Sequence, residues 1–164
     1  MGILPPMNTL LLGAAASAVG TVALDATSYT DMLVRGRGAS AMTQTVAQKI
    51  AAKAGIDALA SPEPDEPTKN RQTALGSLLG PLSGIGVGVI YGAIRPAVRG
   101  RIPVVLAGLL AGAASMALTD VTATMLEATD PKEWDLAGWL SDIVPHAVFG
   151  IATALVFEAL STDA

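Results

Sequence analysis

The amino-acid sequence predicts an all-α integral membrane protein in which four spanning helices form a bundle. The chain of 164 residues is 51% hydrophobic and only 15% charged, with a mean hydropathy of +0.52. A soluble domain carries about 25% charged residues, so the deficit indicates a protein embedded in lipid. The sequence also contains four long apolar segments, each reaching or approaching the length that crosses about 30 Å of hydrocarbon.

The four predicted spans form a single membrane domain and cover about residues 8–33, 72–94, 102–126 and 143–160. No basic region of the kind found in a cleaved signal peptide precedes the first span, so we expect that span to be retained. A polar loop over residues 34–71 follows it. Within this loop we expect one helix over 43–59, with an apolar face formed by Met42, Val46, Ile50 and Ala54.

The second predicted span carries a glycine at every fourth position, and on a helix such positions form one stripe. In water each interior glycine costs about 1 kcal/mol relative to alanine. In a bilayer the same small residues let a neighbouring helix approach closely. We therefore predict helix packing for the stripe, with pore lining as its alternative, and helix packing for two glycines of the third span. These positions are Gly76, Gly80, Gly84, Gly88, Gly92, Gly108 and Gly112.

The segment before the last span predicts a short helix lying at the membrane interface. It opens with Asp130 and Pro131, an acidic N-cap followed by proline at the first helical position. Apolar residues then repeat at helical spacing over 136–143. Trp134 and Trp139 are the only tryptophans and are placed where an aromatic belt would anchor the last span.

An aspartate follows the small-residue stripe of both odd-numbered spans. Asp25 falls on Asp120 when the first span is shifted onto the third, which is consistent with two parallel hairpin repeats. Chance similarity between alanine-rich helices is the alternative. Topology places both aspartates at the same side of the membrane as Asp142 and His146. These four residues are the candidate ion or proton site; interfacial capping and helix–helix hydrogen bonding are the structural alternatives.

Several functional classes are disfavoured by composition and motifs. The net charge of −4 and the 4% aromatic content give no basis for nucleic-acid binding. No cysteine is present to ligate a metal or attach haem. No nucleophile elbow, phosphate-binding loop or clustered metal-ligand motif occurs. We therefore expect no cofactor, no metal and no enzymatic activity.

The functional expectation is a structural or accessory subunit that packs through its Gly/Ala faces. Its partners would be the lipid bilayer and either further copies of itself or a larger membrane complex. The alternative is a small transporter or proton- or ion-conducting protein that uses the intramembrane aspartates. The compact basic loop with Arg95, Arg99 and Arg101 favours an orientation with both termini inside. The arginine and lysine residues of the other loops argue the opposite way.

The last third of the chain resembles the end of YagU-like bacterial inner-membrane proteins. The resemblance rests on Trp134-x-Leu136 followed by Ile143-x-x-His146-x-Val148-Phe149. It implies a multi-pass protein of the bacterial cytoplasmic membrane and no catalytic residues.

Overall fold

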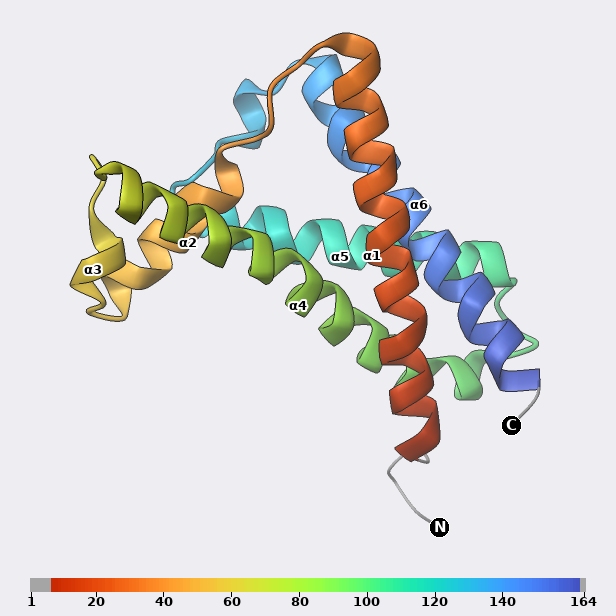
Figure 1. Cartoon of the computed structure of the whole chain (residues 1–164). Helices are drawn as coiled ribbons and strands as arrows, with labels where there is room; N and C mark the ends of the chain where they lie inside the picture. Colours follow the sequence, from red (N-terminus) through yellow and green to blue (C-terminus); the bar gives the residue numbers. More distant parts are fainter. Residues whose placement is uncertain (1–6, 163–164) are drawn as a thin grey trace.

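The computed structural model describes residues 7–162, and this part of the chain is helical and contains no strand. Residues 1–6, on which the expectation of a retained first span partly rests, lie outside the described range. Figure 1 shows helices α1 (Met7–Arg35), α2 (Met42–Lys53), α3 (Asp57–Ala60), α4 (Glu66–Val98), α5 (Val104–Met125) and α6 (Leu136–Thr162). Helices α1, α4, α5 and α6 are long and apolar enough to cross a membrane. The all-helical class and the four candidate spans are thus confirmed.

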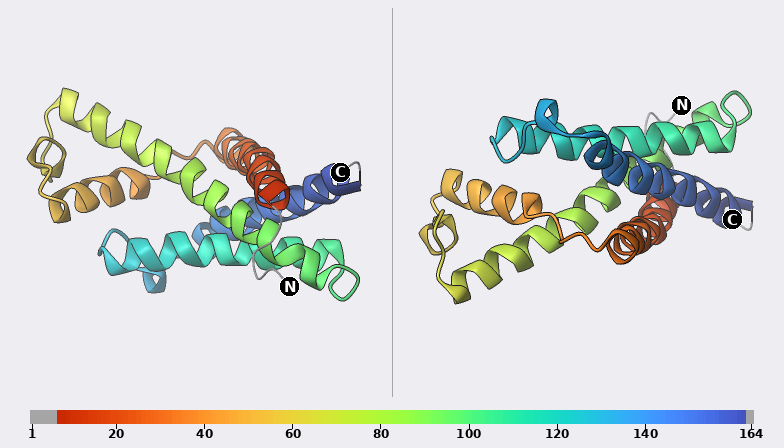
Figure 2. Two further views of the ribbon diagram at one scale, coloured as in Figure 1. Left: turned by 90° about the horizontal axis from the view of Figure 1, so that it is seen from below. Right: turned by 90° about the horizontal axis from the view of Figure 1, so that it is seen from above.

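Helix α1 lies between α4 and α6, and α5 packs on the other side of α6 (Figure 2). The spanning helices alternate in direction. The ends of α1 and α5 and the starts of α4 and α6 therefore lie toward the same end of the molecule, where α1 and α6 diverge from α4 and α5 (Figure 1). We call this the hairpin end, because it carries α2 and α3. The opposite end, formed around the loop from Arg95 to Arg101, is the arginine end.

The polar loop after α1 contains two helices, so the single helix predicted over 43–59 is wrong in extent. Helix α2 ends at Lys53, and Gly55 adopts a left-handed conformation with φ 70°. The N–H of Ile56 then donates to the carbonyl of Ala51 at 2.9 Å, which completes a Schellman turn. Glycine at this position ends the helix because an L side chain is strained at positive φ.

Helix α4 begins at Glu66, before the apolar run that predicts the second span. Asp65 is its N-cap, and the carboxylate accepts a hydrogen bond from the N–H of Thr68 at 3.0 Å. The side-chain and backbone hydrogen bonds of Thr68 lower the pKa of Asp65 below its ordinary value. The capped first turns extend the helix beyond the membrane-spanning length.

The predicted interfacial helix is not a separate element, and that prediction is wrong. Pro131–Glu133 forms a single 3₁₀ turn, and α6 then runs without interruption from Leu136 to Thr162. The carboxylate of Asp135 accepts from the N–H of Gly138 at 2.7 Å and supports the start of α6. We expected a boundary near Ile143 from a change in polarity, but a change in polarity does not interrupt the backbone hydrogen bonds of a helix.

Candidate functional site

Helices α5 and α6 approach closely because glycines occupy their contact. A Cβ added to Gly108 would lie 2.8 Å from the carbonyl oxygen of Gly150. A Cβ added to Gly112 would overlap the carbonyl oxygen of His146. Such close backbone approach is typical of small residues at membrane helix interfaces. It continues toward the hairpin end and brings Asp120 of α5 to the start of α6.

Three titratable side chains meet there: Asp120, Asp142 and His146, which we call the acidic cluster. The Nδ1 atom of His146 lies 3.2 Å from Oδ1 of Asp142 and 2.9 Å from the Asp142 carbonyl oxygen. The Asp120 carboxyl interacts with both of these side chains and is only 9% exposed. The structure therefore brings together three of the four residues of the predicted ion or proton site.

The acidic cluster contains unsatisfied oxygen atoms. Oδ1 of Asp120 and Oδ2 of Asp142 are buried and have no hydrogen-bond partner. Two ionised carboxylates in such a setting repel each other and lack solvation, so sharing a proton lowers the energy. Within residues 7–162 no group of His, Cys, Asp and Glu is arranged to hold a metal ion. The three side chains, with two unpartnered carboxylate oxygens among them, are able to bind a proton.

Asp25 lies apart from this cluster. Its side chain is exposed on the outer face of α1. Exposed residues line this face at alternating spacings of four and three from Leu11 to Tyr29, and Leu33 follows four residues later. We call this face the α1 stripe; it consists of Leu11, Ala15, Ala18, Val22, Asp25, Tyr29 and Leu33.

Four of the five glycines of the α4 stripe meet other parts of the chain. A Cβ on Gly88 would overlap Ser17 and the carbonyl oxygen of Gly13, and one on Gly92 would overlap the carbonyl of Thr9. A Cβ on Gly84 would lie 2.7 Å from Oγ1 of Thr21 in α1, and one on Gly76 2.6 Å from the carbonyl of Thr43 in α2. Around Gly80 there is no such atom within 4 Å. The glycine face of α4 is thus largely occupied inside the chain.

At the arginine end, a charged network that the sequence reasoning missed joins α4 to α6. Nε of Arg95 donates to Glu158 at 2.5 Å, and Nη2 of Arg99 donates to the other carboxylate oxygen at 2.8 Å. Arg95 is 3% exposed and also donates to the carbonyl of Ile102 at 2.8 Å. This pairing could have been predicted from the sequence, because four alternating spans place the end of the fourth span beside the basic loop.

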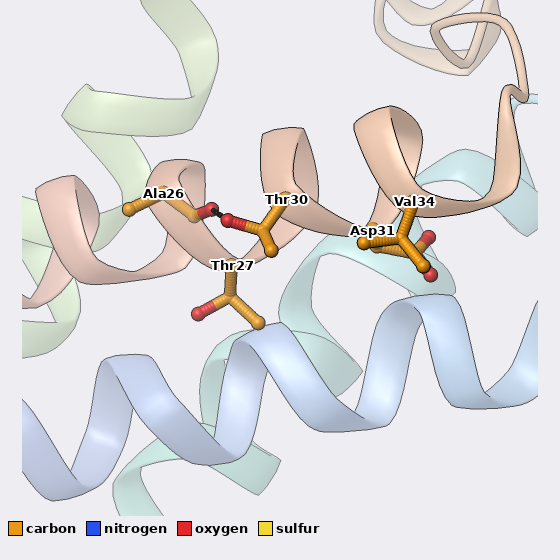
Figure 3. Close-up of a pocket in the computed structure, with 5 residues that line it drawn as sticks. All are labelled: Ala26, Thr27, Thr30, Asp31 and Val34. Atoms are coloured by element: carbon orange, nitrogen blue, oxygen red, sulfur yellow. Dashed lines mark hydrogen bonds between the residues drawn. The ribbon is translucent and has the colours of Figure 1, made fainter.

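A second polar group missed by sequence reasoning lies at the end of α1. Asp31 accepts from Arg35 and from Arg37, each at 2.5 Å, and Arg35 also donates to Ser141 of α6. Figure 3 shows the neighbouring groove, where Thr30 donates to the carbonyl of Ala26 at 2.7 Å. Thr27, the other hydroxyl of the groove, donates to its own helix as well. The polar side chains of this groove are therefore engaged within the protein.

The helices and these sites define a class: a multi-pass helical membrane protein with an acidic cluster at one end and buried arginine pairing at the other. Comparison with known proteins found no matching family model, no matching curated protein and no matching solved structure. The resemblance to YagU-like proteins accordingly stays a prediction.

Proposed function

We propose that this chain is a structural or accessory subunit of a membrane complex and that it associates through the α1 stripe. The observation that supports this function is the position of Asp25, an ionisable side chain exposed on the outer face of a spanning helix. An aspartate near the centre of a spanning helix costs about 2.5–3.5 kcal/mol on insertion scales. A polar contact from a neighbouring subunit would offset that cost.

The spacing of the α1 stripe suits a helical partner. Positions that alternate by four and three form the seam of a left-handed helix pair. Ala15 and Ala18 keep the arginine-end half of the seam small, and this allows close approach. In its protonated form the carboxyl of Asp25 can both donate and accept a hydrogen bond, so a second copy of the chain would satisfy it. A different subunit with a polar residue at the same depth would do so as well.

The glycines have a different role in this proposal from the one expected from sequence. We infer that the α4 stripe acts as a glycine zipper within the chain, since Gly84 and Gly88 meet α1. The outer face of α1 then remains for partners. We also propose a four-helix bundle of two parallel hairpins, a bacterial cytoplasmic membrane location and no enzymatic activity. The contacts of α1 with α4 and of α5 with α6 support the hairpin repeats, and an equally extensive contact of α1 with α6 joins the two hairpins.

The test is the assembly state of the tagged protein in lipid nanodiscs, measured by native mass. We expect a defined complex for the wild type and a smaller species for Asp25→Leu and Ala18→Phe. Ala113→Phe, at an exposed alanine on α5, is the matched control and should leave the complex intact. A monomeric wild type without partners would overturn the proposal.

A second candidate function is favoured by the acidic cluster: a small transporter or proton-conducting protein. Its support is the pair of buried, unpartnered oxygen atoms on Asp120 and Asp142. A carboxyl pair that shares a proton can take up and release protons as the external pH changes. Conduction would additionally need a path from this cluster to the arginine end, where Glu158 is paired with Arg95.

Proton binding at the cluster is measurable by infrared difference spectroscopy and by flux in proteoliposomes. We expect wild-type protein to show the carbonyl band of a protonated carboxylic acid, and Asp120→Asn to lose it. Asp130→Asn, in the loop outside the cluster, should keep the band. Acidification of the vesicle lumen that needs both Asp120 and Asp142 would favour the transporter. A wild type with neither band nor flux would exclude this candidate.

A further inference from the structure

A narrow cleft separates α2 from α5 at the hairpin end of the molecule. Its volume is about 260 Å³, below the roughly 300–1,000 Å³ of pockets for drug-sized ligands. Met42, Val46 and Ile50 line it from α2, Gly80 lies on the α4 wall, and Leu118 and Thr122 face it from α5. We call it the α2 cleft; it involves neither the α1 stripe nor the acidic cluster.

The α2 cleft accounts for two sequence features that the helix contacts leave unexplained. Gly80 is the one member of the α4 glycine stripe with no neighbouring atom within 4 Å, and it opens into this cleft. The apolar face of α2 also points into the cleft. The adjacent side of α2 is closed, because Ala47 and Ala51 are completely buried. The open space at Gly80 and the apolar face of α2 together leave room for an apolar occupant.

Most polar side chains on the walls of the cleft already form hydrogen bonds within their own helices. Oγ of Ser83 donates to the carbonyl of Gly80 at 2.8 Å, and Oγ1 of Thr122 donates to the carbonyl of Leu118 at 2.6 Å. Thr119 likewise donates to Met116 at 2.9 Å. These three hydroxyls are satisfied within their own helices, so hydrocarbon beside them leaves none of their donors unpaired. The remaining hydroxyl of the lining, on Thr43, belongs to an exposed residue.

Charged side chains lie near one end of the α2 cleft only, beyond its lining. Ser83 and Leu118 are at its inner end, and Ile50 and Thr122 are toward the hairpin end. Beyond Ile50, Nζ of Lys49 lies 3.9 Å from a carboxylate oxygen of Glu127, whose side chain is 90% exposed. Such an exposed ion pair is weak. Lys49 is therefore available to an anion at the hairpin end.

We propose that the α2 cleft binds one hydrocarbon chain of an anionic phospholipid, with the lipid phosphate at Lys49. The inner part supplies an apolar channel beside Gly80, and α2 covers the chain and slows its exchange with bulk lipid. The matching of charge at the outer end favours a phosphate-bearing lipid over a free fatty chain or a protein segment.

The experiment uses native mass spectrometry of the full-length protein after delipidation and re-addition of phosphatidylglycerol or phosphatidylcholine. We expect the wild type to retain one phosphatidylglycerol and to prefer it over phosphatidylcholine. Gly80→Leu should lose the bound lipid, because the new side chain would fill the cleft. Gly86→Leu is the matched control: it is another α4 glycine with no atom within 4 Å, it does not line the cleft, and it should retain lipid.

Two further variants separate chain binding from headgroup binding. Val46→Phe should fill the cleft from α2 and also lose the lipid, which guards against a folding defect peculiar to Gly80→Leu. Lys49→Gln should keep a bound chain but lose the preference for phosphatidylglycerol. The proposal is overturned if the wild type retains no phospholipid, or if Gly80→Leu and Gly86→Leu retain it equally. Equal retention of both lipids by the wild type would overturn the assignment of Lys49.

Discussion

Helices α1 and α4 approach closely because the α4 glycines at their contact have no side chain. At Gly88 an added Cβ would overlap the side chain of Ser17 and the carbonyl oxygen of Gly13. At Gly86, two residues earlier on the same helix, it would meet nothing within 4 Å. The same residue type therefore has opposite consequences within one turn of α4. At Gly88 the effect of replacing glycine on stability is determined by packing. At Gly86 it is determined by helix propensity.

We expect Gly88→Ala to lower the free energy of unfolding by about 1–3 kcal/mol, since overpacking forces the helices apart. Gly86→Ala should be neutral or stabilising, because alanine favours helix by about 1 kcal/mol and has free space here. Reversible unfolding in mixed lipid–detergent micelles measures both. Equal effects of the two substitutions would contradict the close contact at Gly88.

The sequence predicted which residues are small or acidic but not which of them have neighbours. Gly80 has the same spacing as Gly84 and Gly88, yet it faces a cleft. Asp25 and Asp120 continue similar stripes, yet one is exposed and the other is buried. Periodicity assigns a residue to a face of its helix. Whether another helix covers that face depends on tertiary contacts, and these contacts cannot be read from the periodicity of a single sequence.

At the scale of the elements, apolar runs located the four spanning helices but not their ends. Helix α4 extends past its apolar run to a cap at Asp65, and α6 extends to a start supported by Asp135. Hydropathy reports transfer into lipid, whereas helix ends depend on capping and on residues such as Gly55. The break between α2 and α3 could have been predicted from Gly55, because glycine is a common C-terminal signal.

The pairing of Arg95 with Glu158 connects α4 to α6. A single substitution that breaks this pair should therefore lower the free energy of unfolding considerably. We expect Glu158→Gln to lower the free energy of unfolding by about 3–5 kcal/mol, because it leaves the buried guanidinium of Arg95 without its counter-charge. The double variant Arg95→Met with Glu158→Leu should recover part of this loss. Thermal unfolding by circular dichroism is the measurement.

Glu127→Gln provides the comparison for that substitution. Its carboxylate is 90% exposed and 3.9 Å from Lys49, so we expect a change within about 0.5 kcal/mol. If Glu158→Gln were as mild as Glu127→Gln, the network at the arginine end would contribute little to stability.

At the scale of the whole molecule, four alternating spans put both described ends of the chain on one side of the membrane. The sequence has no cysteine, so single cysteines are unambiguous reporters. With both termini inside, a membrane-impermeant thiol reagent added outside should label Lys53→Cys and Glu133→Cys. It should not label Arg101→Cys or Ser161→Cys in intact cells. The reverse pattern would invert the orientation, and mixed labelling within either pair would exclude the four-span topology.

The place of α1 between α4 and α6 has a consequence for biosynthesis. The first spanning helix to be translated contacts the last one, and Arg35 and Ser141 are 106 residues apart. At about 5–20 residues per second, on the order of 5–20 seconds pass before the ribosome delivers this partner. Ser17 and Thr21 donate to carbonyls of their own helix, so a newly inserted α1 exposes no unsatisfied hydroxyl donor at these positions while it waits.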